Sequence, residues 1–247
     1  MRYFAELAYK GTNYHGWQRQ PNAVSIQEKV EDAFSTILNQ KIEVVGCGRT
    51  DTGVHASQYY LHFDLEISMP QGFINRMNLF LPKDIALRRV FEVPETLHAR
   101  FDATRRSYEY HIVFEKTPFE IETAWYYYLA KRMDLAALNK TATLLLNYKT
   151  FYPFCKSNHD AQTLECHLQR CEWVLDEKQG RLIFHISANR FLRGMVRLIV
   201  GACMNVALGK LSIDKVKEAM EEQTILEKSW SVPPDGLFLT EVKYPGI

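Results

Sequence analysis

Eleven residues, Gly46 to Ala56, most constrain what this chain can fold into. They read GCGRTDTGVHA and lie between two runs with strand-like side chains, 42–45 and 59–65. A tight hairpin needs only about two connecting residues. Three glycines permit unusual backbone dihedrals and close approach to a ligand, so this loop can hold polar side chains in a fixed geometry. The alternative is an ordinary polar turn, in which Asp51 caps the turn and Arg49 is solvated.

Length and composition are those of a globular protein. The 247 residues suffice for one large domain or two smaller ones, and 47% hydrophobic with 24% charged residues is ordinary. The amino-terminal residues lack the layout of a signal peptide. The most apolar run, 191–208, is interrupted by Arg193 and Arg197, whereas a membrane span needs roughly 18 apolar residues. We therefore expect a cytoplasmic protein without a membrane partner.

Cysteine spacing and net charge exclude few functions. The five cysteines are odd in number and form no Cys-x-x-Cys pair, so we expect no disulfide framework. A loose group comprises Cys155, His159, Cys166, His167 and Cys171; it lacks the paired spacing of zinc sites, and we expect no metal. The net charge of +1 does not indicate a nucleic-acid binder, but a total cannot reveal charge gathered on one face.

Hydrophobic periodicity predicts a strand–helix–strand–strand–helix–strand order in the first hundred residues. Ser25 and Glu28 form a capping box at the start of the first helix. The expected elements are a strand at 2–9, a helix from 25 to 39, strands at 42–45 and 59–65, a helix at 69–81 and a strand at 85–93. This is the order of a ferredoxin-like unit.

A similar but longer order follows. The expected elements are a strand at 108–114, a helix at 133–147, strands at 163–175 and 182–188, helices at 191–208 and 212–222, and a strand at 237–242. We therefore predict an α+β fold of two ferredoxin-like (RRM-like) halves, residues 1–102 and 103–247. The simplest assembly has the halves share a mostly antiparallel sheet with a central cleft.

Asp51 is the first candidate for chemistry. A carboxylate can act as nucleophile, general base or metal ligand, and no second acidic residue lies within three positions. The chain has neither the phosphate-binding Gly-x-x-x-x-Gly-Lys motif nor the dinucleotide-binding Gly-x-Gly-x-x-Gly motif. A cofactor-free reaction that uses one carboxylate remains.

Two basic stretches are further candidates. Between Leu97 and Tyr108, three arginines and a histidine alternate with aromatic residues, which suits contact with phosphates and bases; the alternative is a solvated charged face. In the helix at 191–208, Arg193 can extend to the surface. Arg197 is surrounded by apolar residues, and a partly buried guanidinium needs a carboxylate or an equivalent partner.

The stretch GRTDTGVHA, residues 48–56, resembles the signature loop of the TruA-type tRNA pseudouridine synthases, whose one catalytic aspartate falls at Asp51. Residues 14–21, 191–197 and 232–244 resemble further motifs of that family, so the likeness spans nearly the whole chain. Lys149-Thr150-Phe151 departs from the usual His-x-Phe pattern, which leaves RNA contacts of residues 149–160 open.

The resemblance implies the pseudouridine synthase fold and an isomerase, a homodimer that needs no cofactor and converts uridine to pseudouridine at positions 38, 39 and 40 of the tRNA anticodon stem-loop. Asp51 would be the nucleophile toward sugar or base, and Arg49 would replace the flipped base. Tyr108 would lie against the target base, and Arg197 would pair with Asp51 and hold it ionised. The implied RNA contacts are Leu97, His98, Ala99, Arg100 and Phe101.

Two other classes of function fit parts of the sequence. A non-catalytic RNA-binding protein with two ferredoxin-like halves explains the element order and the aromatic residues, but not Asp51 with Arg197. A small-molecule enzyme with an α/β cleft would need a cofactor or metal motif, and we find none.

Overall fold

The computed structural model describes residues 1–156 and 163–247, which form two compact units. Residues 1–104 and 238–247 make the first unit, and residues 105–237 make the second. These units differ from the predicted halves, 1–102 and 103–247, mainly in the last ten residues, which belong to the first unit. In the described ranges, no helix has both the length and the apolar character that crossing a bilayer requires.

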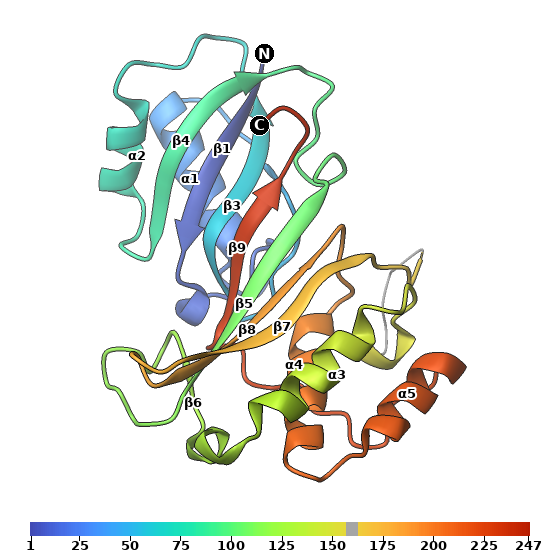
Figure 1. Ribbon diagram of the computed structural model, residues 1–247. Helices are drawn as coiled ribbons and strands as arrows, with labels where there is room; N and C mark the ends of the chain where they lie inside the picture. The colour runs from blue at the N-terminus through green and yellow to red at the C-terminus, as the bar shows by residue number, and fades with distance from the viewer. Residues whose placement is uncertain (157–162) are drawn as a thin grey trace. The chain divides into compact units, whose positions relative to one another are not determined.

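The first unit has the ferredoxin-like element order that the sequence predicts (Figure 1). Strand β1 pairs antiparallel with β3 on one side and with β4 on the other, and the late strand β9 pairs parallel to β3. The elements are β1 (Arg2–Tyr9), α1 (Ile26–Leu38), β2 (Val45–Gly46), β3 (His55–Asp64), α2 (Phe73–Phe80), β4 (Ile85–Val93) and β9 (Leu237–Lys243).

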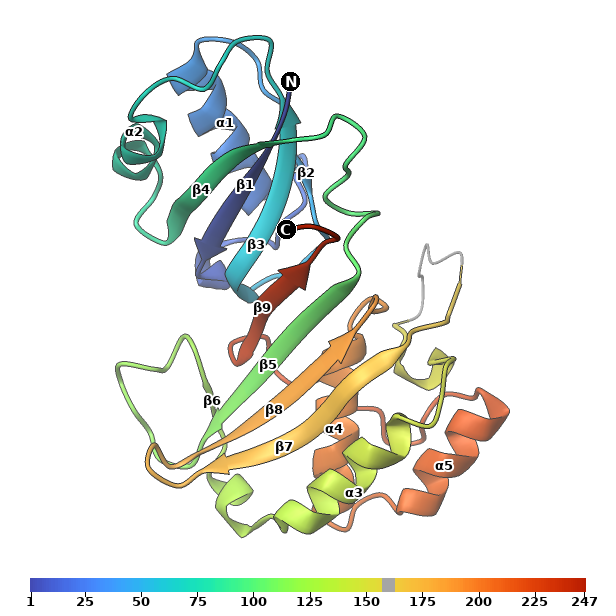
Figure 2. The same cartoon turned by 45° about the horizontal axis from the view of Figure 1, so that its top comes forward.

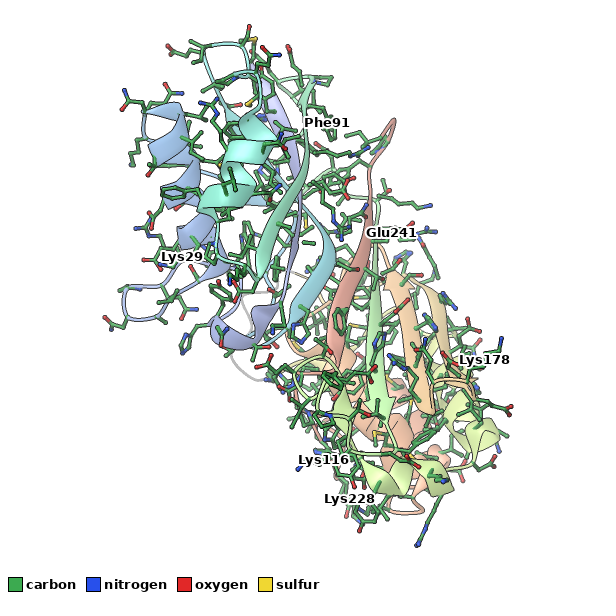
Figure 3. All side chains as sticks on the ribbon, turned by 90° about the vertical axis from the view of Figure 1, so that its left-hand side faces the viewer. Lys29, Phe91, Lys116, Lys178, Lys228 and Glu241 are labelled. Atoms are coloured by element: carbon green, nitrogen blue, oxygen red, sulfur yellow. The ribbon has the colours of Figure 1, made fainter. Side chains whose placement is uncertain are left out.

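Apolar residues of the sheet and of the two helices form the core of the first unit. Phe34 of α1 packs edge-on against Phe63 of β3 and Phe73 of α2, with ring centroids 5.0 and 5.4 Å apart. In Figure 3, Lys29 marks α1 and Phe91 marks β4. Helix α1 begins where predicted, because the Ser25 side chain accepts a hydrogen bond from the Glu28 amide.

The predicted strand at 42–45 is wrong except for its last residue. Ser35 and Glu31, both on α1, accept hydrogen bonds from the backbone amides of Ile42 and Val44 at 2.9 and 3.2 Å. These amides are therefore satisfied by helix side chains instead of a neighbouring strand. Strand β3, in turn, begins at His55 and takes in the end of the glycine-rich loop.

In the second unit, β8 lies between β5 and β7 and pairs antiparallel with both, while β6 runs parallel to β5. Figure 2 shows α3 and α4 on one side of these strands. The elements are β5 (Arg105–Val113), β6 (Trp125–Tyr126), α3 (Leu135–Leu145), β7 (Leu168–Asp176), β8 (Arg181–Ala188), α4 (Met195–Ala207) and α5 (Ile213–Glu222). The predicted α+β class with mostly antiparallel pairing is confirmed.

Helix α4 begins at Met195, four residues later than predicted. Gly194 precedes it with φ +73°, a left-handed conformation that glycine adopts without strain. A Cβ at this position would also meet the side chain of Lys156. The helix therefore starts after the Arg193-Gly194 turn.

Candidate active site and RNA-contacting turn

The loop that carries Asp51 is anchored at the residues just before the aspartate. Thr50 is held twice: its hydroxyl lies 2.9 Å from that of Tyr9, and its carbonyl oxygen accepts the Trp17 amide at 3.3 Å. Tyr59 of β3 donates its hydroxyl hydrogen to the Gly48 carbonyl at 2.5 Å. These contacts fix the backbone on both sides of Arg49.

The residues after Asp51 are anchored as well. The Val54 amide donates to the Asp51 carbonyl at 3.1 Å and closes the turn, in which Gly53 has φ +78°. The Gly53 amide donates to the Tyr14 carbonyl at 3.3 Å. Nδ1 of the buried His55 side chain accepts a hydrogen bond from the Gly11 amide at 2.9 Å. Asp51 thus sits between two fixed ends.

Two glycines let the segment 10–17 approach the loop this closely. Gly16 has φ +84°, and a Cβ on it would overlap the Thr50 carbonyl oxygen. A Cβ on Gly11 would overlap the Val54 carbonyl oxygen. This segment includes part of the stretch 14–21 that the sequence singled out, and its structural role is to support the loop.

Aromatic rings form a rigid floor beneath the loop. Trp17 stacks on Tyr59 with ring centroids 4.1 Å apart, and Tyr9 lies 5.5 Å from Tyr59. All three are buried. Above this floor, Asp51 is half-buried and Arg49 is exposed. A carboxylate held this way suits nucleophilic or general-base chemistry, because little ordering remains to be done in the reaction.

The predicted RNA-contacting stretch 97–101 forms a tight turn in the first unit, clamped at Ala99. The Ala99 amide donates to Nδ1 of His62 at 3.1 Å, and its carbonyl accepts the hydroxyl of Tyr244 at 2.6 Å. Leu97 is held through its carbonyl, which accepts from Arg2 at 3.1 Å. His62 and Tyr244 lie outside every stretch that the sequence singled out for RNA contact.

His98 closes the turn from inside. Its amide donates to the Asp102 carboxylate at 2.6 Å, and its Nδ1 accepts the amides of Arg100 and Phe101 at 3.1 and 3.3 Å. Arg100 and Phe101 are exposed at the tip of the turn, and Ala99 is buried beneath them. The turn therefore presents a cation and an aromatic ring on a fixed backbone.

His98 of the turn and His62 of β3 are both held neutral, which their role as hydrogen-bond acceptors requires. Burial, followed by the positive charge of Arg2, lowers the pKa of His62 to about 4. The same two causes lower the pKa of His98. A neutral imidazole keeps a lone pair on Nδ1 for the backbone amides.

Tyr108 and Arg197 belong to the second unit. Tyr108 lies on β5 opposite Ile186, and its ring meets the Phe191 ring edge-on with centroids 5.1 Å apart. Tyr108 is half-buried. Phe191, which belongs to the stretch resembling the family's helix motif, thus orients the predicted base-stacking tyrosine.

Arg197 on α4 is half-buried, whereas Arg193, which lies just before the helix, is exposed; this agrees with the difference expected from the sequence. The Arg197 Nε–H donates to the Val232 carbonyl at 2.6 Å, and this fixes the stem of the side chain. Nearby, burial raises the pKa of Tyr110, and the charge of Arg197 opposes that shift. The predicted Arg197–Asp51 ion pair concerns residues of two units and stays a prediction.

The metal prediction concerns a group that includes His159, which lies outside the described residues. Residues 1–156 and 163–247 contain no group of three or more His, Cys, Asp or Glu side chains suited to a metal. Burial raises the pKa of Cys166 to about 11 and that of Cys203 to about 12. These thiols are therefore protonated at neutral pH.

Comparison with known proteins agrees with these features. The protein-family model described as tRNA pseudouridine synthase matches residues 5–102 and 147–245. The chain is 42% identical over 246 residues to tRNA pseudouridine synthase A of Bacteroides thetaiotaomicron, covering 99% of this chain and 91% of the relative. It is 35% identical to tRNA pseudouridine synthase A of a Hydrogenobaculum species, covering 96% and 97%.

The chain therefore belongs to the tRNA pseudouridine synthase family. It is an isomerase, which excludes both the non-catalytic RNA-binding module and the cofactor-dependent small-molecule enzyme as its class.

Proposed function

We propose that this chain converts uridine to pseudouridine at positions 38, 39 and 40 in the anticodon stem-loop of tRNA. Family membership and the names of the relatives support tRNA as the substrate. The observation that carries the proposal is the anchored loop, in which Thr50 and Gly53 are fixed on either side of Asp51.

The reaction is an internal rearrangement. The bond between N1 of uracil and C1′ of ribose breaks, and a new bond forms between C5 and C1′. C5 loses a proton and N1 gains one, so the atoms balance and no electrons are exchanged with a second reagent. A single carboxylate that forms and releases a covalent bond suffices for this chemistry.

Asp51 is the proposed nucleophile, attacking either the ribose carbon or the pyrimidine ring. A base within the stem must first leave the helix, which costs a few kcal/mol. Arg49, exposed two residues before Asp51, is proposed to enter the vacated stack and lower that cost. Its planar guanidinium can stack on the neighbouring bases.

Tyr108 and Arg197 complete the proposed catalytic set. Tyr108 stacks on the extruded uracil, with Phe191 supporting its ring from the side. Arg197 pairs with Asp51 and keeps the carboxylate ionised at neutral pH. The hydrogen bond from Arg197 Nε to the Val232 carbonyl supports this role, because it reduces the number of orientations open to the guanidinium.

The turn at 97–101 is the proposed contact with the rest of the RNA, through the residues Leu97, His98, Ala99, Arg100 and Phe101. We further propose that the protein is a cytoplasmic homodimer that binds tRNA. Sedimentation or gel filtration over the working range of concentrations tests the dimer, and a monomer mass throughout would exclude it.

Activity is tested on tRNA transcripts carrying tritium at C5 of uridine, because pseudouridine formation releases that atom. Three transcripts, each with one of positions 38, 39 and 40 kept as uridine and the other two replaced by cytidine, resolve the sites. We expect release from the wild type and none from Asp51→Asn, with RNA binding retained. Equal release from both proteins would exclude Asp51 as the nucleophile, and no release from any transcript would contradict the proposed sites.

A further inference from the structure

An open pocket of about 530 Å³ lies beside the clamped turn of the first unit. Its wall includes Thr96, Leu97, Phe101, Asp102, Thr104 and Pro245. Its volume falls within the range of roughly 300–1,000 Å³ that is usual for small-ligand sites. The chemistry assigned above to Asp51, Arg49, Tyr108 and Arg197 does not use this pocket.

Phe101 supplies the pocket with an exposed aromatic surface. The Phe101 residue is 73% exposed, so its ring is accessible to a ligand. The Phe101 ring centroid lies 4.4 Å from the His98 ring centroid. The Arg100 guanidinium carbon lies 5.5 Å from the Phe101 ring centroid. The ring is therefore fixed in place and carries a positive charge beside it.

The hydrogen bonds within the turn at 97–101 reduce the conformational entropy that Phe101 would lose on binding a ligand. The amides of His98, Ala99, Arg100 and Phe101 all donate to side chains, so the backbone of the turn is ordered before any ligand arrives. A preordered aromatic group loses little conformational entropy on binding. This feature distinguishes Phe101 from an exposed hydrophobic residue on a mobile loop.

Asp102 indicates which part of a nucleotide fits the pocket. Asp102 lines the pocket, and its negative charge would repel a phosphate. Arg100, next to Phe101 and exposed, provides the matching site for a phosphate outside the pocket. The distribution of charge thus favours a base inside and its phosphate on the rim.

We propose that this pocket binds one unpaired nucleobase of the RNA substrate, stacked on Phe101, with Arg100 contacting the adjoining phosphate. The inference rests on the proposed function in that the RNA is tRNA. Proteins read RNA chiefly through unstacked bases that lie on aromatic side chains or arginine planes. The occupied base is distinct from the uridine that reacts at Asp51.

The first test compares the affinity of an unmodified tRNA transcript for four proteins. Phe101→Ala should weaken binding about 5- to 150-fold, the range for loss of one base–aromatic stack, and Phe101→Trp should restore it. Phe119→Ala is the matched control, since Phe119 is 97% exposed among Glu115, Glu120 and Glu122 and should leave binding unchanged. Equal binding by wild type and Phe101→Ala would overturn the proposal.

A second variant fills the pocket without touching the ring. Thr96→Trp should weaken binding as Phe101→Ala does, and Leu79→Trp, at an exposed position on α2, should not. In a salt titration, Arg100→Ala should reduce the slope of log affinity against log salt by about 1, the value for one lost phosphate contact. Phe101→Ala should leave that slope unchanged. A Thr96→Trp protein that binds like the wild type would overturn the pocket assignment.

The base itself is found by coupling. Each unpaired nucleotide of the transcript is replaced in turn by an abasic one. The affinity of each abasic transcript is then measured for the wild-type protein and for Phe101→Ala. One abasic position should weaken wild-type binding and have no further effect in the variant. If no position couples although the wild type turns over uridine, the base pocket is wrong and the proposed function stands. If the wild type forms no pseudouridine, the proposed function is wrong, and the coupling alone decides the pocket.

Discussion

Tyr59 donates its hydroxyl hydrogen to the carbonyl oxygen of Gly48 across 2.5 Å, and this joins the floor of the first unit to the loop that carries Asp51. The bond ties a strand residue to a loop residue three positions before the aspartate. Tyr59 is fully buried, and burial raises the pKa of its hydroxyl, so the donor stays protonated.

Removing this donor should loosen the loop. Tyr59→Phe keeps the ring stacked on Trp17 but leaves the Gly48 carbonyl without that hydroxyl, at a cost of roughly 1–3 kcal/mol in the free energy of unfolding. We expect turnover to fall as well. Tyr3→Phe is the control, because the Tyr3 hydroxyl makes a long contact with the Met1 sulfur, at 3.8 Å. Urea unfolding and tritium release measure the two effects; unchanged turnover would mean that the loop holds its geometry without Tyr59.

The close approach of segment 10–17 to the loop should not tolerate a side chain at Gly16. Gly16→Ala forces a Cβ onto the Thr50 carbonyl at φ +84°, so we expect a loss of more than about 1 kcal/mol in stability and a clear loss of activity. Gly72→Ala separates the steric overlap from the strain of a positive φ, since Gly72 has φ +72° with open space around it. Thermal unfolding of both variants should show the larger shift for Gly16→Ala; equal shifts would contradict a steric role.

Two arginines four residues apart, Arg197 on α4 and Arg193 just before that helix, offer a matched comparison. Arg197→Met should reduce pseudouridine formation about 100-fold or more, the effect of losing roughly 3 kcal/mol of electrostatic support for the carboxylate. Arg193→Met, at an exposed position, should remain within a few-fold of wild type. Single-turnover rates at saturating tRNA measure the difference. Full activity of Arg197→Met would leave the proposed ion pair without a catalytic role.

Stability should depend on pH through His62. Its pKa is about 4 in the folded protein against an ordinary value of 6.5, so the unfolded chain binds more protons between these values. Stability is therefore fully present above pH 6.5 and declines as the pH falls toward 4, by roughly 3 kcal/mol for this group. His62→Asn, which keeps an acceptor but does not titrate, should flatten that part of the profile.

The control for the pH experiment is His15→Asn, because His15 is exposed. Urea unfolding at several pH values between 7.5 and 4 should give His15→Asn the wild-type slope. A His62→Asn profile parallel to that of the wild type would show that another group causes the decline.

The sequence predicted best those features that depend on local patterns. The periodicity of α1 and the Ser25–Glu28 cap located that helix, and the exposure of Arg193 against Arg197 followed from the residues around them. The glycine-rich loop was recognisable because few sequences combine three glycines with Arg49 and Asp51.

Features that depend on distant partners could not be predicted. Residues 42–44 have strand-like side chains, but α1 supplies the partners for their backbone amides. His62 reads as one more residue of a strand, and only the fold brings it to Ala99. Nothing in a single sequence indicates that a histidine will accept a hydrogen bond from a turn thirty-seven residues away.

Strand β9 makes the first unit depend on residues that are translated after the second unit. It pairs with β3 at His55 and Ala56, and the chain beyond it brings Tyr244 to the Ala99 carbonyl. The start of β3 and the turn at 97–101 therefore lack these contacts until residues 238–244 have left the ribosome. A nascent chain can fold most of its amino-terminal sheet early, yet the turn at 97–101 acquires its final form only after the whole second unit has been translated.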